Sequence, residues 1–275
     1  MKLAVVGLGL IGASVAKALA GRASITGIDR DPGAVKKALA QGVISRGGSD
    51  PSLARGSEIV VIAVPVGSIV GAAGDLIPHL DADTVITDTG STKEAIVRAI
   101  DGLWPCFVGS RPIAGKENPG FGASQPDLFS GKVTILTPGA ATRNSCLQRV
   151  RGLWEACGSK VVEMDPVQHD GLMARISHMP HLLSFASMGL AHDLHIHREL
   201  LGAGFRDFTR IAASDPVMWR DIFLANRDQL LELVESYIRE LEAMAAIIRQ
   251  GRSEELEELL RGYSSLRREL YASAR

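Results

Sequence analysis

The sequence predicts an α/β protein in which a mostly parallel sheet, covered by helices on both faces, precedes an all-helical region. Before Pro166, short β-rich runs alternate with helical stretches, a pattern typical of parallel sheets. After Pro166 the β-rich runs stop, and nearly everything to Leu270 has helical spacing. We therefore expect two domains, one of residues 1–165 and one of residues 166–275.

The expected strands are short β-rich runs separated by helical stretches. Parallel neighbours need such crossover connections, so each helix should join two strands of one sheet. The runs are Leu3–Val6, Ser24–Ile28, Ile59–Val64, Thr84–Thr87, Phe107–Val108, Val133–Leu136 and Lys160–Val162.

The composition is that of a globular protein and limits its partners. Of 275 residues, 46% are hydrophobic and 22% are charged, and the net charge is −1. Such a small charge gives no long-range attraction to nucleic acid or to an anionic membrane, and no stretch is apolar and long enough to span a bilayer. We therefore expect neither partner. The apolar start resembles a signal peptide, but its early glycines and strand–turn–helix pattern argue against one.

The cysteines indicate a reducing compartment. Cys106, Cys146 and Cys157 are odd in number and form no CxxC pair. We interpret them as buried free thiols, which favours a cytoplasmic protein.

The first chemical signal is the glycine pattern Gly7-Leu-Gly9-Leu-Ile-Gly12. It follows a β-rich run and opens a helix, which is the context that a dinucleotide-binding fingerprint requires. Gly7 permits the tight turn, Gly9 allows a pyrophosphate to approach the backbone, and Gly12 allows close packing of helix on strand. The helix start, with Leu10 and Ile11, then offers free N–H groups to the phosphates. A structural glycine turn is the less favoured alternative, and we predict a Rossmann domain.

An acidic residue at the end of the next run favours NAD over NADP. Asp29 can accept hydrogen bonds from the adenosine ribose hydroxyls and would repel a 2′-phosphate. Arg30 is the competing feature, because an arginine at this point can pair with that phosphate. We expect NAD as the cofactor.

Two further segments follow predicted strands, at the edge of the sheet where a cofactor should bind. Val64 and Pro65 come after the third run. Asp88-Thr-Gly-Ser91-Thr92-Lys93 follows the fourth and opens a helix. Ser91 or Thr92 could simply be the N-cap of that helix. We favour a functional role for Ser91 beside the nicotinamide.

The series GLGLIGAS, DTGSTK, GSRPIAGKENPGF, HDGLMARISHMPHLLSFA and GFRDFTRIAASDPVMWRDIF resembles the prephenate and arogenate dehydrogenase family of tyrosine biosynthesis. The resemblance runs from Met1 to about Arg227, and its last two motifs are highly specific. It implies an NAD(P)-dependent oxidative decarboxylation: hydride leaves the ring carbon that bears a hydroxyl, carbon dioxide leaves the opposite carbon, and the ring becomes aromatic.

The resemblance also implies roles for individual residues. Ser91 corresponds to the serine that orients nicotinamide and substrate hydroxyl, His181 to a histidine of the substrate pocket, and Arg210 to the arginine that clamps the side-chain carboxylate. An arginine suits that task, because its planar fork binds carboxylates in bidentate fashion. Further implied pocket residues are His178, Asp207 and Trp219.

Arg111 is the largest departure from the family pattern. The family usually has a histidine in the loop that is GSRP here, where it hydrogen-bonds the ring hydroxyl and helps to remove its proton. A guanidinium cannot accept a proton at any working pH. Three explanations stay open. Arg111 turns away while water or His181 accepts the proton, or the substrate carries a 4-amino group that needs no base, as in 4-amino-4-deoxyprephenate dehydrogenases, or the chain binds NAD without turnover. A β-hydroxyacid dehydrogenase is a further alternative.

The histidines do not form a convincing metal site. His169, His178 and His181 lack the pre-arranged spacing and the carboxylate or thiolate partner that zinc prefers, and Pro180 separates the last two. We expect no metal. The group His192, His195 and His197 is interpreted as flanking a helix end.

A heptad pattern predicts a homodimer. Apolar residues recur at alternating spacings of four and three in the last long helical stretch, and such a stripe often packs against a second subunit. An ordinary core helix is the alternative. The residues are Leu230, Val234, Tyr237, Leu241, Met244 and Ile248.

Overall fold

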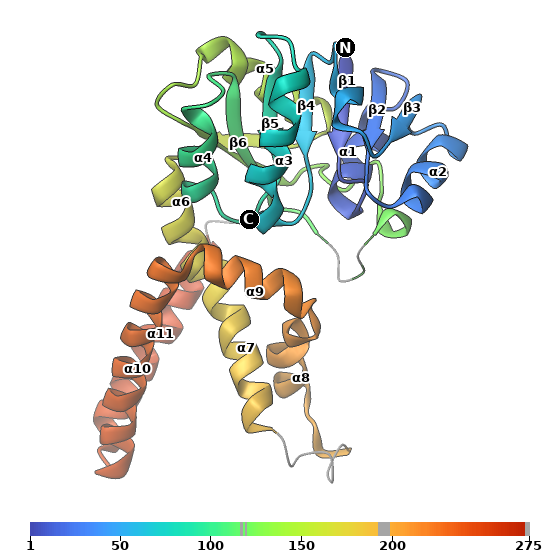
Figure 1. The fold of residues 1–275 in the computed structure, drawn as a ribbon. Helices are drawn as coiled ribbons and strands as arrows, with labels where there is room; N and C mark the ends of the chain where they lie inside the picture. The colour runs from blue at the N-terminus through green and yellow to red at the C-terminus, as the bar shows by residue number, and fades with distance from the viewer. Residues whose placement is uncertain (116–117, 119, 192–198, 273–275) are drawn as a thin grey trace. The chain divides into compact units, whose positions relative to one another are not determined.

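The computed structural model describes residues 1–115, 118, 120–191 and 199–272. Its centre is an eight-stranded sheet of order β3-β2-β1-β4-β5-β6-β7-β8 (Figure 1). Every neighbouring pair is parallel except β6 and β7. The mostly parallel sheet predicted from the sequence is therefore confirmed. The strands are β1 (Lys2–Val6), β2 (Ser24–Ile28), β3 (Arg46–Gly48), β4 (Ile59–Ile62), β5 (Val85–Asp88), β6 (Phe107–Pro112), β7 (Val133–Pro138) and β8 (Lys160–Glu163).

Helices cover both faces of this sheet because its central strands are apolar on both sides. In β1, Leu3 and Val5 point into one buried cluster and Ala4 and Val6 into another. The first cluster also contains side chains of α1, α2 and α5, and the second those of α3 and α4. The bounds are α1 (Leu10–Leu19), α2 (Pro32–Ala40), α3 (Ile69–Leu76), α4 (Glu94–Asp101) and α5 (Asn144–Ala156).

The segment Gly109-Ser-Arg-Pro112 belongs to a strand, and its prediction as a loop was wrong. It completes β6, which pairs with β7 in antiparallel register, with Arg111 opposite Ile135. Gly109 permits this pairing, because a Cβ there would lie 2.4 Å from Thr137 Oγ1. Arg111 therefore projects from a hydrogen-bonded ladder.

Strand β3 has no counterpart among the predicted runs. Its sequence, Arg-Gly-Gly, lacks the β-branched and aromatic residues by which strands are recognised. The structure supplies the reason for one glycine, since a Cβ on Gly47 would lie 2.8 Å from the Gly27 carbonyl oxygen of β2.

After β8 the described chain is helical, as predicted. A short π-helix, Ala174–His178, joins the first two helices. The chain forms two compact units, Met1–Arg227 and Asp228–Arg275, so the sheet and the helices up to α9 belong to one unit. The division at residue 165 stays a prediction about domains. The helices are α6 (Pro166–Met173), α7 (Met179–Leu190), α8 (Ala203–Thr209), α9 (Pro216–Ala225), α10 (Arg227–Arg249) and α11 (Ser253–Ala272).

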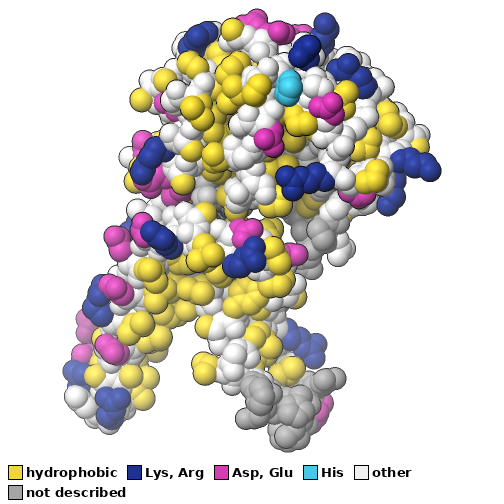
Figure 2. Space-filling view, in the orientation of Figure 1, with side chains coloured by type: hydrophobic (Ala, Val, Ile, Leu, Met, Phe, Trp, Pro, Cys, Tyr) yellow, Lys and Arg dark blue, Asp and Glu magenta, His cyan; other side chains and the backbone are white. Residues whose placement is uncertain are grey.

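The second unit is a helical hairpin that exposes much of its apolar surface. Gly251, with a φ of +64°, provides the turn between α10 and α11. Along the heptad stripe of α10, Tyr237, Leu241 and Ile248 are 40%, 51% and 61% exposed. Hydrophobic side chains are visible along these helices in Figure 2. These three residues of the stripe are therefore available to a partner, whereas Leu230 at its start is buried.

Two of the three cysteines do not match their prediction as free thiols. Cys106, just before β6, is bonded to Cys146 on α5, with a Cα–Cα distance of 5.5 Å. The fold brings together two residues that are 40 positions apart, and sequence spacing carries no sign of this. Cys157 is free and buried. None of the described helices has the length and apolar character needed to cross a membrane.

Candidate active site

The glycine turn between β1 and α1 has the shape of a dinucleotide-binding site. Gly7 has a φ of +91°, and a Cβ on it would lie 2.5 Å from the Ala63 carbonyl oxygen. A Cβ on Gly12 would lie 1.9 Å from the Gly7 carbonyl oxygen, so this position requires glycine for helix packing. Around Gly9 there is open space, with no atom within 4 Å of a Cβ built there. Open space at Gly9 is what a pyrophosphate needs.

The start of α1 is left open for an anion. Gly9 is its N-cap and provides no side-chain cap, and the first turn contains no acidic residue. The N–H groups of Leu10 and Ile11 therefore keep their capacity to bind phosphate oxygens.

Asp29 is fixed at the carboxyl end of β2. The Leu8 N–H donates to its Oδ2 at 2.6 Å, and the Asp31 N–H donates to its Oδ1 at 2.8 Å. Each carboxylate oxygen keeps a second lone pair that can accept from a hydroxyl group. This arrangement suits a ribose diol.

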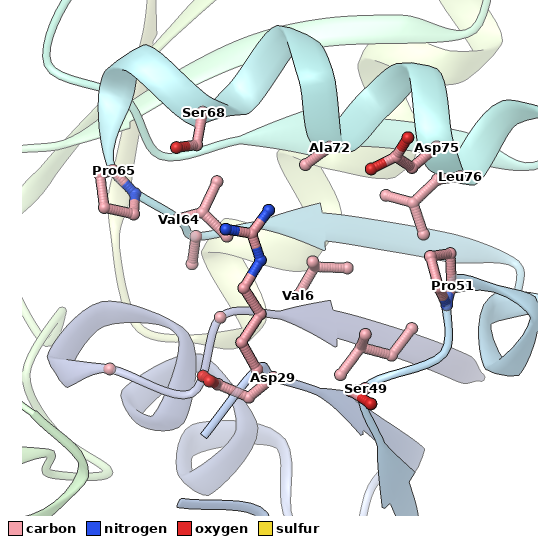
Figure 3. Close-up of a pocket in the computed structure, with 15 residues that line it drawn as sticks. Val6, Asp29, Ser49, Pro51, Val64, Pro65, Ser68, Ala72, Asp75 and Leu76 are labelled. Atoms are coloured by element: carbon pink, nitrogen blue, oxygen red, sulfur yellow. The ribbon is translucent and has the colours of Figure 1, made fainter. Parts of the chain in front are cut away.

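A cavity of about 640 Å³ begins at this turn. Figure 3 shows side chains that line it, with Asp29 at the end of β2 and Asp75 and Leu76 on α3. Its walls are mainly apolar, and its size and lining fit the adenosine half of a dinucleotide. Predicted residues that line it are Gly7, Gly9, Asp29, Arg30, Val64 and Pro65; further lining residues include Val6, Ser49, Pro51, Ser68 and Ala72.

Strand β5 ends in a buried ion pair. Asp88 and Lys93 are both 0% exposed and in direct contact. The Asp88 carboxylate also accepts from the Gly90 N–H at 2.8 Å and the Ser110 N–H at 3.1 Å. Burial lowers the pKa of Lys93, and Asp88 opposes this shift. The contact between Asp88 and Lys93 thus fixes both ends of the turn that carries Ser91.

Helix α4 receives its cap from a different helix. The carboxylate of Asp170, on α6, accepts from the Lys93 N–H at 2.8 Å and from the Glu94 N–H at 2.9 Å. An acid at a helix N-terminus is stabilising for this reason. Ser91 and Thr92 therefore do not cap α4, and the simple capping explanation of the DTGSTK motif is wrong.

Asp170 also organises two buried histidines. Its carboxylate lies 2.7 Å from His169 Nδ1, so this nitrogen carries the ring proton. The Asp170 carbonyl accepts from Asn226 Nδ2 at 2.9 Å, which orients the amide, and the same NH₂ group lies 3.0 Å from His178 Nδ1. His178 Nδ1 must then accept, and its proton is on Nε2.

Both histidines are neutral and enclosed. Each is 0% exposed. Burial lowers the pKa of His178 to about 3, with Arg111 adding repulsion, and burial also lowers the pKa of His169. Among the described residues, neither Nε2 atom has a hydrogen-bond partner.

Arg111 lies among these groups as a permanent cation. Its Nη1 donates to the Ser91 carbonyl oxygen, so the guanidinium supports the turn that carries Ser91. Burial lowers the pKa of Arg111 to about 10, while Asp170 opposes the shift. The side chain remains charged at neutral pH and offers no lone pair.

A second cavity, of about 610 Å³, is lined by His181, Arg210 and Trp219. The His181 ring stacks on Trp219, with centroids 3.6 Å apart and planes 22° apart. Its Nδ1 lies 2.9 Å from the Ser177 carbonyl oxygen in the π-helix. Other lining residues are Gly115, Asn118, Ile211, Ala213, Ser214 and Met218. An aromatic wall, a histidine and an arginine suit a small ring-containing acid.

The remaining predicted residues occupy less direct positions. His178 is buried and does not line either cavity. Asp207 is exposed on α8 and lines neither cavity. Ser91 is half-buried and is connected to the cluster through Arg111. The group His192, His195 and His197 lies outside the described residues.

Sequence reasoning missed the residues that connect the site. Asp170 and Asn226 have central positions in the hydrogen-bond network; Asp170 lies in a quoted motif but was given no role, and Asn226 lies outside every quoted motif. Only the proximity of Asp170 to His169 in the sequence hinted at a polar cluster. The role of Lys93 as a buried partner of Asp88 was also missed, because a lysine at a helix start is normally exposed.

The fold and these two cavities define a nicotinamide-dinucleotide-dependent dehydrogenase with a helical region that completes its site. The family model described as the prephenate dehydrogenase nucleotide-binding domain matches residues 13–163, and the one described as the prephenate dehydrogenase dimerization domain matches residues 165–262. The chain belongs to the prephenate dehydrogenase family.

Individual relatives agree with this assignment. The prephenate dehydrogenase of Bacillus subtilis is 36% identical over 91% of this chain and 71% of its own length. The cyclohexadienyl dehydrogenase of Zymomonas mobilis is 32% identical over 90% of this chain and 88% of its own. The crystal structure of Aquifex aeolicus prephenate dehydrogenase, in complex with hydroxyphenyl propionate and NAD+, superposes with a TM-score of 0.92 at 34% identity and covers 98% of both chains.

Proposed function

We propose that this protein catalyses the NAD-dependent oxidative decarboxylation of prephenate, or of arogenate, to 4-hydroxyphenylpyruvate or tyrosine. The observation that carries the proposal is the cavity in which His181, Arg210 and Trp219 meet, in a chain that has a complete dinucleotide turn. The relatives named above act on cyclohexadienyl substrates, which supports the same substrate class.

In this proposal, separate groups of residues bind the cofactor and the substrate. Gly9, Leu10 and Ile11 at the helix start bind the pyrophosphate, and Asp29 binds the adenosine ribose. NAD, when bound, supplies the hydride acceptor. Arg210 binds the side-chain carboxylate of the substrate.

Within the second cavity, Trp219 provides an apolar surface for the ring. The tied turn after β5 holds Ser91 toward nicotinamide and substrate hydroxyl. Asp207 and His178 support the pocket without lining it.

A homodimer is part of this proposal. The exposed heptad stripe of α10 supports it, and so does the match to a family model described as a dimerization domain. Light scattering at micromolar concentration should give twice the chain mass of 29.3 kDa. A monomeric mass with the fold intact would exclude the dimer. We place the enzyme in the cytoplasm, as its biosynthetic relatives suggest.

The test of the function is direct. Purified protein is offered prephenate and arogenate with NAD, and reduced cofactor is followed by its absorbance. Turnover of either substrate, with carbon dioxide released in equal amount, supports the proposal; turnover of neither refutes it.

Arg111 favours a second candidate substrate, 4-amino-4-deoxyprephenate. The lone pair of a 4-amino group delocalises the positive charge that hydride loss creates, and the product is a neutral aromatic amine without any base. Including this analogue in the same assay separates the candidates, because an enzyme for the amino substrate should prefer it over prephenate and arogenate.

A further inference from the structure

The structure raises the question of which group accepts the substrate hydroxyl proton when position 111 is an arginine. Hydride leaves the ring carbon that bears the hydroxyl group, and its loss builds positive charge on that same carbon. A neutral base that takes up the hydroxyl proton relieves this charge. Arg111 cannot do so, because its guanidinium is charged and donates to the Ser91 carbonyl.

The buried groups around Arg111 can be eliminated one by one. His178 is fully enclosed, and its proton is on the free Nε2 because Asn226 donates to Nδ1. His169 is equally enclosed and donates to Asp170. The Asp170 carboxylate is 2% exposed and accepts from two N–H groups of α4. None of these three can reach a substrate.

His181 differs from them because it lines a cavity. It lines the second cavity together with Arg210, where a substrate carboxylate would be bound. Its Nδ1 faces a carbonyl oxygen, which only accepts, so the proton is on Nδ1 and Nε2 has a free lone pair. Stacking on Trp219 fixes the plane of the ring. Among the described residues that line this cavity, His181 alone has a side chain that can take up a proton near neutral pH.

The local backbone makes this orientation possible. Pro180 lacks an N–H, and the π-helix Ala174–His178 ends just before α7. Such irregular turns release carbonyl groups from the regular helical ladder. The Ser177 carbonyl oxygen belongs to this π-helix and lies 2.9 Å from His181 Nδ1.

We propose that His181 is the proton acceptor of this enzyme. The proposal rests on the function proposed above. In the step, hydride passes from the ring carbon to NAD while the hydroxyl proton moves to His181 Nε2. The bond to the ring carboxylate then breaks, carbon dioxide leaves, its electron pair completes the aromatic ring, and the proton returns from Nε2 to the ring oxygen.

The charges around His181 agree with this assignment. Burial lowers the pKa of His181, and the hydrogen bond to Ser177 opposes this shift. Arg111 on β6 and Arg210 after α8 lower it further, and the neighbouring His178 is neutral. A neutral imidazole should thus persist into mildly acidic solution.

The experiment compares His181→Asn, Arg111→Met and Arg111→Lys with the unmodified enzyme, using prephenate and NAD across a range of pH. Asparagine keeps a donor near the Ser177 carbonyl but removes the base. We expect His181→Asn to lower kcat by about 10²–10⁴-fold and to remove the acidic limb of the kcat profile. Arg111→Met should move that limb to higher pH, and Arg111→Lys, which keeps the charge, should leave it near its original position.

Two controls test whether the variants are folded and whether removal of any arginine would move the limb. The far-UV circular dichroism spectrum of every variant should match that of the unmodified enzyme, which shows that the variants are folded. Arg98→Met removes an arginine whose side chain is 75% exposed and should not move the limb.

The inference is overturned if His181→Asn raises only KM and leaves kcat unchanged, or if its acidic limb persists. It is also overturned if Arg111→Met and Arg111→Lys behave alike. Turnover of the 4-amino substrate alone would leave the oxidative decarboxylation standing but refute the need for a base. Failure of the unmodified enzyme with all three substrates would refute the proposed function, and the inference with it.

Discussion

The buried ion pair Asp88–Lys93 gives the sharpest stability prediction, because Asp88 has further hydrogen-bond partners and Lys93 depends on Asp88. Both side chains are 0% exposed. If Lys93 is replaced by Met, the Asp88 carboxylate keeps two backbone donors, from Gly90 and Ser110. If Asp88 is replaced by Asn, the Lys93 ammonium loses the one carboxylate that it contacts. The two substitutions should therefore differ in cost.

The magnitudes follow from this asymmetry. Removing one partner of a buried ion pair costs about 3–5 kcal/mol, and we expect this range for Asp88→Asn. For Lys93→Met we expect about 1–3 kcal/mol, since the remaining charge stays hydrogen-bonded. The double substitution should cost less than the sum of the two, because neither charge is then left alone.

Urea unfolding at fixed protein concentration measures these differences. The Asp88→Asn penalty should also shrink as pH rises. Burial lowers the pKa of Lys93, so without Asp88 the native state loses this proton more readily than the unfolded state. The unfolded state then binds more protons, and stability increases with pH. Equal penalties for the two single variants, or a larger one for Lys93→Met, would refute the reasoning.

Four further results are expected. Asp29→Ser should narrow the preference for NAD over NADP in kcat/KM, and equal use of both cofactors by the unmodified enzyme would point to Arg30 instead. Arg210→Ala should weaken substrate binding by about 1.5–3 kcal/mol, the range for a hydrogen bond to a charged group, without changing NAD affinity; an unaltered KM would show that Arg210 has only a structural role. Because burial lowers the pKa of His178 from 6.5 to about 3, its contribution to stability is complete above pH 6.5 and is lost as pH falls toward 3, by up to about 5 kcal/mol; His178→Gln should flatten the acid side of a stability–pH curve, and an unchanged curve would count against it. Burial raises the pKa of Cys157 to about 12, so a thiol reagent at pH 8 should label the native protein slowly and the denatured, unreduced protein at one thiol per chain; rapid native labelling would contradict this.

The sequence contained enough information for the fold class and for the dinucleotide turn. Central strands such as Ile59–Ile62 are buried on both faces of the sheet, and their continuous apolar sequence predicts this burial. Gly7 and Gly12 are required because a Cβ at either position would lie less than 3 Å from a backbone atom, and the glycine pattern predicts this close approach. Strand β3 was missed because its glycines have low β-propensity; Gly47 is there because the backbone of β2 approaches it closely. The end of β6 was missed because glycine and proline normally indicate a loop.

The site was predictable residue by residue but not as a network. His181, Arg210 and Trp219 belong to specific motifs, and the structure brings them to one cavity. Asp170 binds N–H groups 76 and 77 positions away, and Asn226 reaches back 48 and 56 positions. Partners so distant in the chain leave no periodicity in the sequence, and the Cys106–Cys146 bond was missed for the same reason.

The cap that Asp170 places on α4 has a consequence for motion. If α6 swung away from the sheet, two main-chain donors of α4 would be exposed without their carboxylate, and the Asn226 amide would lose its anchor. Opening therefore costs several hydrogen bonds at once, in agreement with a single compact unit from Met1 to Arg227. We expect the amides of Lys93 and Glu94 to exchange slowly with deuterium even in the absence of cofactor. We therefore expect the pocket to be formed before substrate binds, without separation of α6 from the sheet.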